Sequence, residues 1–428
     1  MNRKIRVGFV SSHFRRHSVC KLFCGIITGL DSNIFDVYVF SSLSETKEDE
    51  RSKDLISVLT HRYVRLGMTT TKNRDEVTGR RIDVLVYLDV GMTPATPIWA
   101  ASRLAPIQVV TWGHPVTTGM SSMDYFVSSS LYHDHHNDSS LKLQDMYSEQ
   151  VVQLDALGFY FHRPILSFQM ISSSLGNEGT ITVDNTRPEV DYLFASRPES
   201  FYHGLQEKLK ENNGSSSSSD LNELINEKLL GAKIILCPQH LPKFHPHFDY
   251  ILNRLLAQVP NSILVVLGDK SKDQWRRTID QRWRRNIGAY NMQRVMWIGN
   301  LSPTEYLIML AVGDLMLDPY PFGGGVTILE SIAVCTPVIT SPSLQTVPGL
   351  AAGMLQSMDL TKLDLLVATN QDDYVEKATL LLGAKDQTVN KELVRLRRKM
   401  CEKGHLLYNN TKSIDEWSRF LKTVALFI

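Results

Sequence analysis

The sequence has almost no net charge. Its 46 lysines and arginines balance 45 aspartates and glutamates, so the formal net charge is +1 over 428 residues. A charge this small exerts no long-range attraction on nucleic acid or on an anionic membrane surface. The chain also lacks an apolar run as long as a membrane span. We therefore expect a protein that binds neither nucleic acid nor membrane.

Cysteine is also scarce. None of the five cysteines forms a C-x-x-C pair, and most lie in or beside apolar segments. This usage is typical of reduced, buried thiols in a cytosolic or nuclear protein. The first apolar run begins at Ile5, which leaves no room for a secretory signal peptide. We therefore expect a cytoplasmic or nuclear location. The cysteines are Cys20, Cys24, Cys237, Cys335 and Cys401.

Short apolar runs alternate with amphipathic helical patterns along most of the chain. Such alternation predicts an α/β protein with parallel, doubly wound sheets. No G-x-G-x-x-G follows a predicted strand, which disfavours a dinucleotide-dependent oxidoreductase. A helix is expected at Pro303–Val312. The expected strands include Ile5–Val10, Phe35–Phe40, Arg62–Leu66, Asp83–Leu88, Ile107–Trp112, Tyr125–Ser128, Lys233–Cys237, Ser262–Leu267 and Val295–Ile298.

The length predicts two domains rather than one core. We expect a Rossmann-like domain over residues 1–185, a second over residues 186–385 and a helical tail over residues 386–428. A low-complexity insert at about 211–220, which contains NNGSSSSSD, is expected to be a mobile surface loop. Ligands of such domains bind at the carboxyl ends of the strands.

The segment Asp314–Thr340 carries the clearest chemical motif. An apolar run ends at Asp318, three glycines follow, and a helical pattern opens at Val326. Glycines let backbone N–H groups approach a ligand, and a helix amino terminus favours phosphate. A tight turn without a ligand has the same glycines. Glu330, one turn into the helix, suits a ribose contact, although it also fits a solvent-facing glutamate.

Lys243 follows another predicted strand, in the segment CPQHLPKFHPHFD. At the carboxyl edge of the sheet its ammonium would meet a phosphate. A lone lysine is also common as a solvated surface residue. The second phosphate-type element, at Gly323–Gly325, favours the binding role.

Five ordered segments together resemble the catalytic region of the O-GlcNAc transferase/SPINDLY family of glycosyltransferases, in the branch common in bacteria and protists. The resemblance implies the GT-B fold, with two Rossmann-like domains facing a cleft. It covers most of the chain, with gaps between 163 and 230. The segments are Ile5–His17, Arg103–Tyr125, Tyr147–Glu149, Cys237–Asp249 and Met316–Thr340.

The resemblance also implies roles for individual residues. Lys243 matches the lysine that binds the donor diphosphate, and His17 matches the active-site histidine near the acceptor. Tyr306 falls where a side chain covers the base, and His240 where a polar side chain faces the nucleotide. The remaining matches are Gly323, Gly324, Gly325 and Thr327 at the phosphates, Glu330 at the ribose, and His114, Thr117 and Thr118 in a loop towards the cleft.

The activity implied is metal-independent, inverting transfer of GlcNAc from UDP-GlcNAc to Ser/Thr hydroxyls of acceptor proteins, with no cofactor. GDP-fucose is the alternative donor, as in the SPINDLY branch, and a non-catalytic nucleotide-sugar-binding scaffold is the other alternative. The sequence departs from the family pattern at His13, where the family has aspartate, and at Met92. It also has no arginine between Ser341 and Met354.

Two further clusters suggest weaker hypotheses. Tyr132–His136 has metal-ligand composition, but adjacent residues do not converge on one ion, so we expect no metal site. Trp275–Arg285 mixes aromatic and basic residues as nucleic-acid binders do. An amphipathic helix that packs its tryptophans and exposes its arginines explains this second pattern better.

Overall fold

The chain folds into two compact units, each built around a parallel sheet. The computed structural model describes residues 3–67, 69–113, 115–133, 143–170, 179–182, 194–211, 216–268, 274–341, 349–360, 365–383 and 391–428. One unit comprises Met1–His162 and Tyr408–Ile428, and the other comprises Arg163–Ser343 and Leu350–Leu407. The predicted α/β fold with doubly wound parallel sheets is confirmed.

The amino-terminal unit has a seven-stranded sheet in the order β3-β2-β1-β4-β5-β6-β7, with every neighbouring pair parallel. Strands such as VLVY in β4 are buried along their whole length, as expected for a sheet covered on both faces. The strands are β1 Ile5–Ser11, β2 Phe35–Ser41, β3 Tyr63–Arg65, β4 Val84–Tyr87, β5 Ile107–Thr111, β6 Tyr125–Ser129 and β7 Gln150–Leu154; the helices are α1 Ser18–Gly29, α2 Glu50–Leu59, α3 Thr70–Gly79, α4 Ala95–Ala100 and α16 Thr411–Val424.

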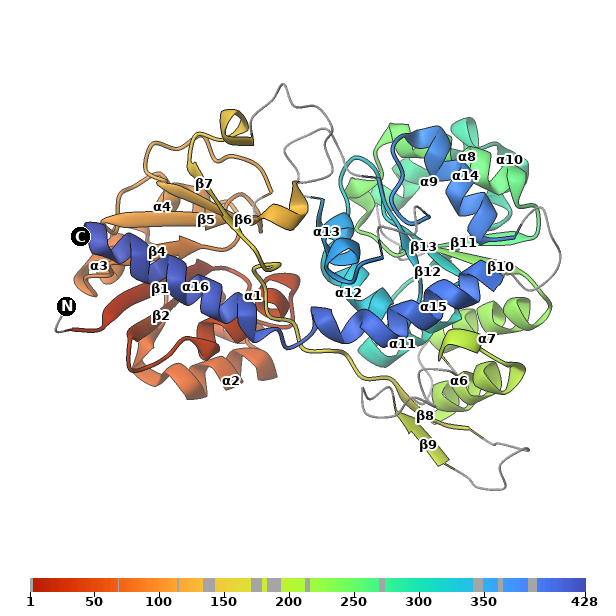
Figure 1. Ribbon diagram of the computed structural model, residues 1–428, viewed down its shortest axis with the longest axis horizontal. Coiled ribbons are helices and arrows are strands. Elements are labelled where there is room, and N and C mark those ends of the chain that lie inside the picture. Colours follow the sequence, from red (N-terminus) through yellow and green to blue (C-terminus); the bar gives the residue numbers. More distant parts are fainter. Residues whose placement is uncertain are drawn as a thin grey trace. The chain divides into compact units, whose positions relative to one another are not determined.

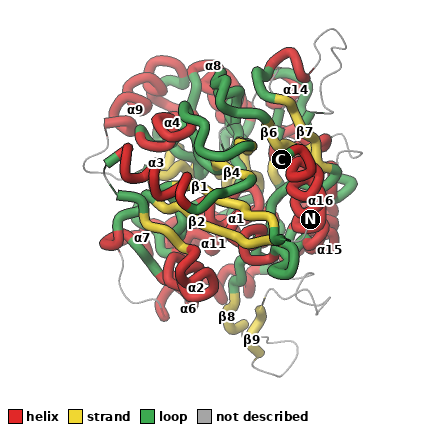
Figure 2. The backbone as a smooth tube through the Cα atoms, turned by 90° about the vertical axis from the view of Figure 1, so that its left-hand side faces the viewer, coloured by secondary structure: helices red, strands yellow, loops and turns green. Residues whose placement is uncertain are grey.

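The last helix returns to this first unit. The Trp417 indole N–H donates to the Gly158 carbonyl at 2.9 Å, and the Glu416 carboxylate accepts the Ala156 N–H at 2.8 Å. Tyr125 of β6 meets Phe420 edge to face, with ring centroids 5.7 Å apart. The start of β1 also lies near the end of α16, since Arg3, Lys4 and Ile5 line one hollow together with Lys422, Thr423 and Leu426; Figure 1 and Figure 2 show α16 beside the first unit.

The second unit has a five-stranded parallel sheet in the order β12-β11-β10-β13-β14 and a separate hairpin, β8-β9. Its strands are β8 Ser167–Met170, β9 Gly179–Thr182, β10 Lys233–Cys237, β11 Ser262–Leu267, β12 Val295–Ile298, β13 Leu315–Leu317 and β14 Val338–Ile339. Its helices are α6 Glu199–Glu211, α7 Ser216–Leu229, α8 Pro246–Gln258, α9 Gln274–Asn286, α10 Ala289–Met292, α11 Pro303–Val312, α12 Val326–Ala333, α13 Leu350–Ser357, α14 Gln371–Leu381 and α15 Lys391–Lys403.

Local sequence explains where several helices begin. At α11, the Ser302 hydroxyl accepts the Glu305 N–H, and the Glu305 carboxylate accepts the Ser302 N–H, so both ends of a capping box are present. Pro303 occupies the first helical position, where a missing N–H costs nothing. The predicted helix Pro303–Val312 is therefore confirmed to the residue.

The serine-rich insert is helical from Ser216, so the prediction of a loop up to Asp220 is wrong there; residues 212–215 lie outside the described part. The Ser218 hydroxyl donates to the Glu305 carboxylate at 2.9 Å. This tertiary contact stabilises the first turns of α7, and composition alone does not reveal it.

The prediction of five reduced thiols is wrong for four cysteines. Cys20 and Cys24 form a disulfide within α1, and Cys335 and Cys401 form a second one. One turn of helix brings the first pair together. Residues 66 positions apart form the second, and only the tertiary structure brings them close. Cys237 is a free, buried thiol.

The units divide after His162, whereas the sequence placed a boundary at residue 185. Arg163 is already held by the second unit, because its guanidinium donates to the Ala333 carbonyl at 3.1 Å. The helical tail predicted for residues 386–428 contributes α15 to the second unit and α16 to the first. None of the helices within the described ranges is long and apolar enough to cross a membrane.

A buried charge cluster stabilises the second unit. The Asp314 carboxylate accepts hydrogen bonds from the Lys228 ammonium at 2.5 Å, the Ile234 N–H at 2.9 Å and the Arg397 guanidinium at 2.9 Å. These cations hold the pKa of Asp314 far below its usual value, against the opposing effect of burial. Asp314 thereby links α7 and α15 to the sheet.

We predict that Asp314→Ala lowers the free energy of unfolding by about 3–5 kcal/mol, because two buried cations lose their partner. Denaturant unfolding of the variant and the parent measures the change. Glu207→Ala is the control: its ion pair with Lys210 is exposed, so we expect a loss below about 1 kcal/mol. Equal effects of the two substitutions would contradict this view of Asp314.

Candidate functional site

The topology of each sheet singles out one position for a ligand. Strand order reverses between β10 and β13 in the second unit, and between β1 and β4 in the first. The loops that leave two such strands diverge to opposite sides of the sheet and open a crevice at their carboxyl ends. Candidate residues lie at both of these switch points.

In the second unit, Lys243 and the glycine turn come together. Lys243 ends the short 3-10 helix Leu241–Lys243 after β10, and its ammonium donates to the Gly323 carbonyl at 2.8 Å. It also donates to the Gln239 side-chain oxygen at 3.3 Å and lies 5.0 Å from the centre of the Phe322 ring. Burial lowers the pKa of Lys243, and the nearby Asp318 carboxylate acts in the opposite direction. The contacts therefore hold a cation at the glycine turn.

Asp318 shapes the glycine turn. One carboxylate oxygen accepts the Gly324 N–H at 2.6 Å, and the other accepts the Thr340 hydroxyl at 2.7 Å. Burial raises the pKa of Asp318 to about 6. A side chain at Gly324 would start 2.5 Å from both Gln239 Nε2 and Thr327 Oγ1. A larger residue there would displace the Gln239 and Thr327 side chains from their hydrogen bond, and the Asp318 contact fixes the backbone of the turn before any ligand arrives.

Gln239 connects the two halves of this site. Its amide donates to Thr327 Oγ1 at 2.6 Å, while its oxygen accepts from Lys243. The sequence assigned the nucleotide-facing role to His240, but the structure exposes His240 and buries Gln239. The role of His240 stays a prediction, and Gln239 is the buried side chain that links Thr327 to Lys243. Gln239 lies two residues after the buried strand β10, and this position is the sequence feature from which its place in the site could have been predicted.

The remaining predicted residues of this unit lie on α11 and α12. Gly325 precedes α12, whose first residue is Val326. Glu330 is buried on the second turn, and it raises the pKa of the Tyr306 hydroxyl in addition to the effect of burial. Tyr306 is partly exposed, but its hydroxyl is buried and has no hydrogen-bond partner among the described residues. Glu330 and Tyr306 are therefore neighbours near the helix that begins at the glycine turn.

In the first unit, the loop after β1 carries His17. His17 caps α1, since its Nδ1 accepts the Val19 N–H at 3.3 Å. Its ring stacks on His13, with centroids 4.0 Å apart. Burial, together with the neighbouring His13, Arg15 and Lys21, lowers the pKa of His17 to about 4. The imidazole is therefore neutral at physiological pH.

Glu149 positions the two predicted threonines. Its carboxylate accepts the Thr117 hydroxyl and the Thr118 N–H, each at 2.8 Å, and also the Thr118 hydroxyl. These hydrogen bonds hold the pKa of Glu149 below its usual value despite burial. The two threonines lie in the loop after β5, in which Gly113 is an early residue. A side chain at Gly113 would lie 1.9 Å from the Leu88 carbonyl oxygen, so only glycine fits there. His114 lies outside the described residues.

Sequence reasoning named neither Asp89 in the first unit nor Asp318 in the second as a site residue. Both follow a buried strand and lie at a switch point, beside a loop from the neighbouring strand. Among the residues that the structure covers, no three His, Cys, Asp or Glu side chains converge as metal ligands. In the segment Tyr132–His136, His133 Nε2 and Ser128 Oγ form a hydrogen bond of 2.8 Å. Residues 134–136 lie outside the described part.

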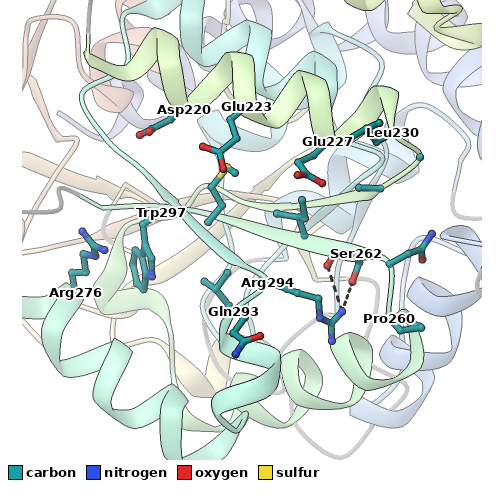
Figure 3. Close-up of a pocket in the computed structure, with 16 residues that line it drawn as sticks. Asp220, Glu223, Glu227, Leu230, Pro260, Ser262, Arg276, Gln293, Arg294 and Trp297 are labelled. Atoms are coloured by element: carbon teal, nitrogen blue, oxygen red, sulfur yellow. Dashed lines mark hydrogen bonds between the residues drawn. The ribbon is translucent and has the colours of Figure 1, made fainter.

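A pocket of about 770 Å³ lies elsewhere in the second unit (Figure 3). Glu223 and Glu227 of α7 line one side of it, and Arg294 lies opposite, bonded to Ser262. Its lining includes residues that precede β10, β11 and β12, so it opens at the amino ends of the strands. None of the predicted site residues lines it, so it is separate from the glycine turn.

Comparison with known proteins supports the sequence resemblance. Residues 1–177 match the family model described as Glycosyl transferase family 41. The probable UDP-N-acetylglucosamine–peptide N-acetylglucosaminyltransferase SPINDLY of Arabidopsis thaliana is 24% identical over 385 residues, which are 87% of this chain and 34% of that protein. The UDP-glucose:protein N-beta-glucosyltransferase of Actinobacillus pleuropneumoniae serotype 5b is 23% identical over 323 residues, which are 74% of this chain and 40% of that one.

The chain thus spans about a third of the length of the SPINDLY relative. Among solved structures, a mutant of the O-GlcNAc transferase of Thermobaculum terrenum superposes with a TM-score of 0.72 at 19% identity, over 99% of this chain and 69% of that one. Sucrose-phosphate synthase from Thermosynechococcus elongatus superposes with a TM-score of 0.51 at 12% identity, over 99% of this chain and 100% of that one. The predicted GT-B fold is confirmed. The chain is similar to the family 41 glycosyltransferases over residues 1–177 and to SPINDLY of Arabidopsis thaliana over most of its length, as its motifs indicated.

Proposed function

We propose that the protein is an inverting glycosyltransferase that moves GlcNAc from UDP-GlcNAc to Ser/Thr hydroxyls of proteins. The observation that carries the proposal is the half-buried Lys243 ammonium, fixed on the glycine turn at a switch point. In this reaction the acceptor hydroxyl loses its proton to a base and its oxygen bonds to the anomeric carbon, while the bond between the anomeric carbon and the diphosphate oxygen breaks and its electron pair leaves on UDP. Lys243 then stabilises the charge that develops on the diphosphate.

The amino terminus of α12 supports the same role. The first N–H groups of a helix have no partner within it, and its dipole attracts an anion. α12 begins directly after Gly325, and Thr327 Oγ1 is oriented by Gln239. We propose that these groups receive the diphosphate with Lys243, and that Glu330 accepts a ribose hydroxyl. Since a lysine and a helix terminus supply positive charge, we propose transfer without a metal ion.

The names of the relatives favour a uridine nucleotide. Both SPINDLY of Arabidopsis and the Actinobacillus enzyme are named for UDP-sugars. GDP-fucose remains the competing donor. We predict that UDP binds the protein and that GDP binds at least about tenfold more weakly, a difference of about 1.4 kcal/mol. Calorimetric titration with each nucleotide measures this ratio, and tighter binding of GDP would reverse the donor assignment.

We predict that Lys243→Ala lowers the rate at which UDP is formed from UDP-GlcNAc by at least about 100-fold, because the leaving diphosphate loses its cation. Lys210→Ala, which removes an exposed lysine of the same unit, is the control and retains full turnover. Thermal unfolding of both variants checks that the fold is intact. Near-normal turnover by Lys243→Ala would remove this residue from the mechanism.

We also predict that EDTA leaves turnover unchanged, because protein groups supply the positive charge at the diphosphate. Initial rates with and without chelator, followed by added Mn²⁺, provide the measurement. A rate that falls with EDTA and recovers with Mn²⁺ would overturn the metal-free proposal. A wild-type protein that binds UDP but does not release it from UDP-GlcNAc would favour a non-catalytic scaffold.

A further inference from the structure

One peptide group at the glycine turn is held between two opposite charges. Its carbonyl, from Gly323, accepts the Lys243 ammonium at 2.8 Å, and its N–H, from Gly324, donates to Asp318 Oδ1 at 2.6 Å. The carbonyl and the N–H belong to one planar unit and point in opposite directions. The N–H end therefore faces an anion and the carbonyl end faces a cation, so both charges favour the same orientation of this peptide dipole.

Asp318 can hold the peptide group because its own position is fixed. Oδ2 accepts the Thr340 hydroxyl at 2.7 Å, and the Asp318 backbone carbonyl accepts the Tyr374 hydroxyl at 3.0 Å. The residue directly follows β13 and is 4% exposed. Contacts from the end of β14 and from α14 thus place the carboxylate before it meets the turn.

The glycine turn needs such an anchor. Gly323 and Gly324 have no side chain to restrict their backbone, and a rotated peptide group would turn the Gly323 carbonyl away from Lys243. A side chain at Gly323 would start 2.6 Å from Asp318 Oδ2, so the carboxylate packs directly against the turn. Glycine makes room for the carboxylate, and the carboxylate selects one orientation of the peptide group.

The carboxylate acts on Lys243 without covering it. The hydrogen bonds of the ammonium within the described residues go to neutral acceptors, which are the Gly323 carbonyl and the Gln239 side-chain oxygen. A carboxylate bonded directly to the ammonium would compete with an incoming phosphate for its strong, charge-assisted hydrogen bonds. With a peptide group in between, the positive charge stays available to an anion.

We propose that Asp318 is the positioning residue for Lys243: through the peptide group of Gly323 and Gly324 it holds the ammonium where the diphosphate of the donor binds. This inference rests on the proposed function and deepens it. Asp318 itself does not touch the nucleotide in this role. All the residues that take part belong to the second unit.

The titratable groups around this pair come from β10 and α14 as well as from the turn. Burial lowers the pKa of Lys243, while Asp318 and Cys237 act in the opposite direction. Burial raises the pKa of Asp318 to about 6, so it is a carboxylate at neutral pH. Burial also raises the pKa of the Cys237 thiol and of the Tyr374 hydroxyl, so both are neutral there. A neutral residue at position 318 should therefore lower the pKa of Lys243.

Asp318→Asn tests this role, because it removes the charge and nearly keeps the shape. UDP affinity falls as rising pH deprotonates Lys243, and we expect this fall to begin at least about 0.5 pH unit lower in Asp318→Asn than in the parent. Calorimetric titration of the full chain with UDP, from neutral to alkaline pH, measures the shift. Asp280→Asn makes the same change at an ion pair with Arg284 on α9 and is the control that leaves the profile unchanged.

A readout without nucleotide completes the test. NMR titration of the lysine ammonium groups of the full chain, with Lys243 assigned by Lys243→Arg, should show a lower Lys243 pKa in Asp318→Asn and in a second neutral variant, Asp318→Ser. The double variant Lys243→Ala/Asp318→Asn should bind UDP no more weakly than Lys243→Ala. An unchanged Lys243 pKa, or a further loss of affinity in the double variant, overturns the inference. Absence of UDP binding by the parent, with the pKa change present, overturns the proposed function alone.

Discussion

Parallel strand pairing is the constraint on which both candidate sites depend. It places all carboxyl ends of a sheet at one edge, and the reversal of strand order separates the loops there. Lys243 and Gly323 are 80 residues apart in sequence, yet they meet because β10 and β13 are neighbours. Ser12 and Asp89 are 77 residues apart and meet because β1 and β4 are neighbours. The same topological rule thus assembles a cationic site in one unit and a histidine–carboxylate site in the other.

The two sites differ in their electrostatics. In the second unit, the Lys243 ammonium is desolvated and bonded to neutral acceptors, so it retains capacity to stabilise an incoming anion. Asp318 lies beneath the turn and fixes its backbone. In the first unit, Asp89 and His13 are buried side by side with one unpaired atom each. Groups fixed in advance need little reorganisation during the reaction, which is how electrostatic catalysis gains its effect.

The structure shows what surrounds two of the positions at which the sequence departs from the family pattern. His13 stands where the family has aspartate, but a carboxylate is still present beside the loop, supplied by Asp89 from the neighbouring strand. At the glycine turn, Val326 opens a helix whose first turn is oriented by Gln239 and Thr327. The chain therefore keeps the lysine that matches the family's, Lys243, at one switch point and has a carboxylate from a neighbouring strand, Asp89, at the other.

The sequence by itself determined the strongly periodic elements: β10, β11, β12 and α11 have the predicted bounds, because their apolar pattern and caps are local. It also identified Lys243 and the glycine turn, since strand-end position is visible in the pattern. It did not determine β7, an edge strand with a half-exposed pattern, or the start of α7, which depends on the contact between Ser218 and Glu305. The Cys335–Cys401 disulfide and the contacts of Gln239 with Thr327 and of Asp89 with Ser12 were decided only by the tertiary structure. Each of these depends on which strands and helices become neighbours, and pairing across 66 to 88 residues leaves no local signal.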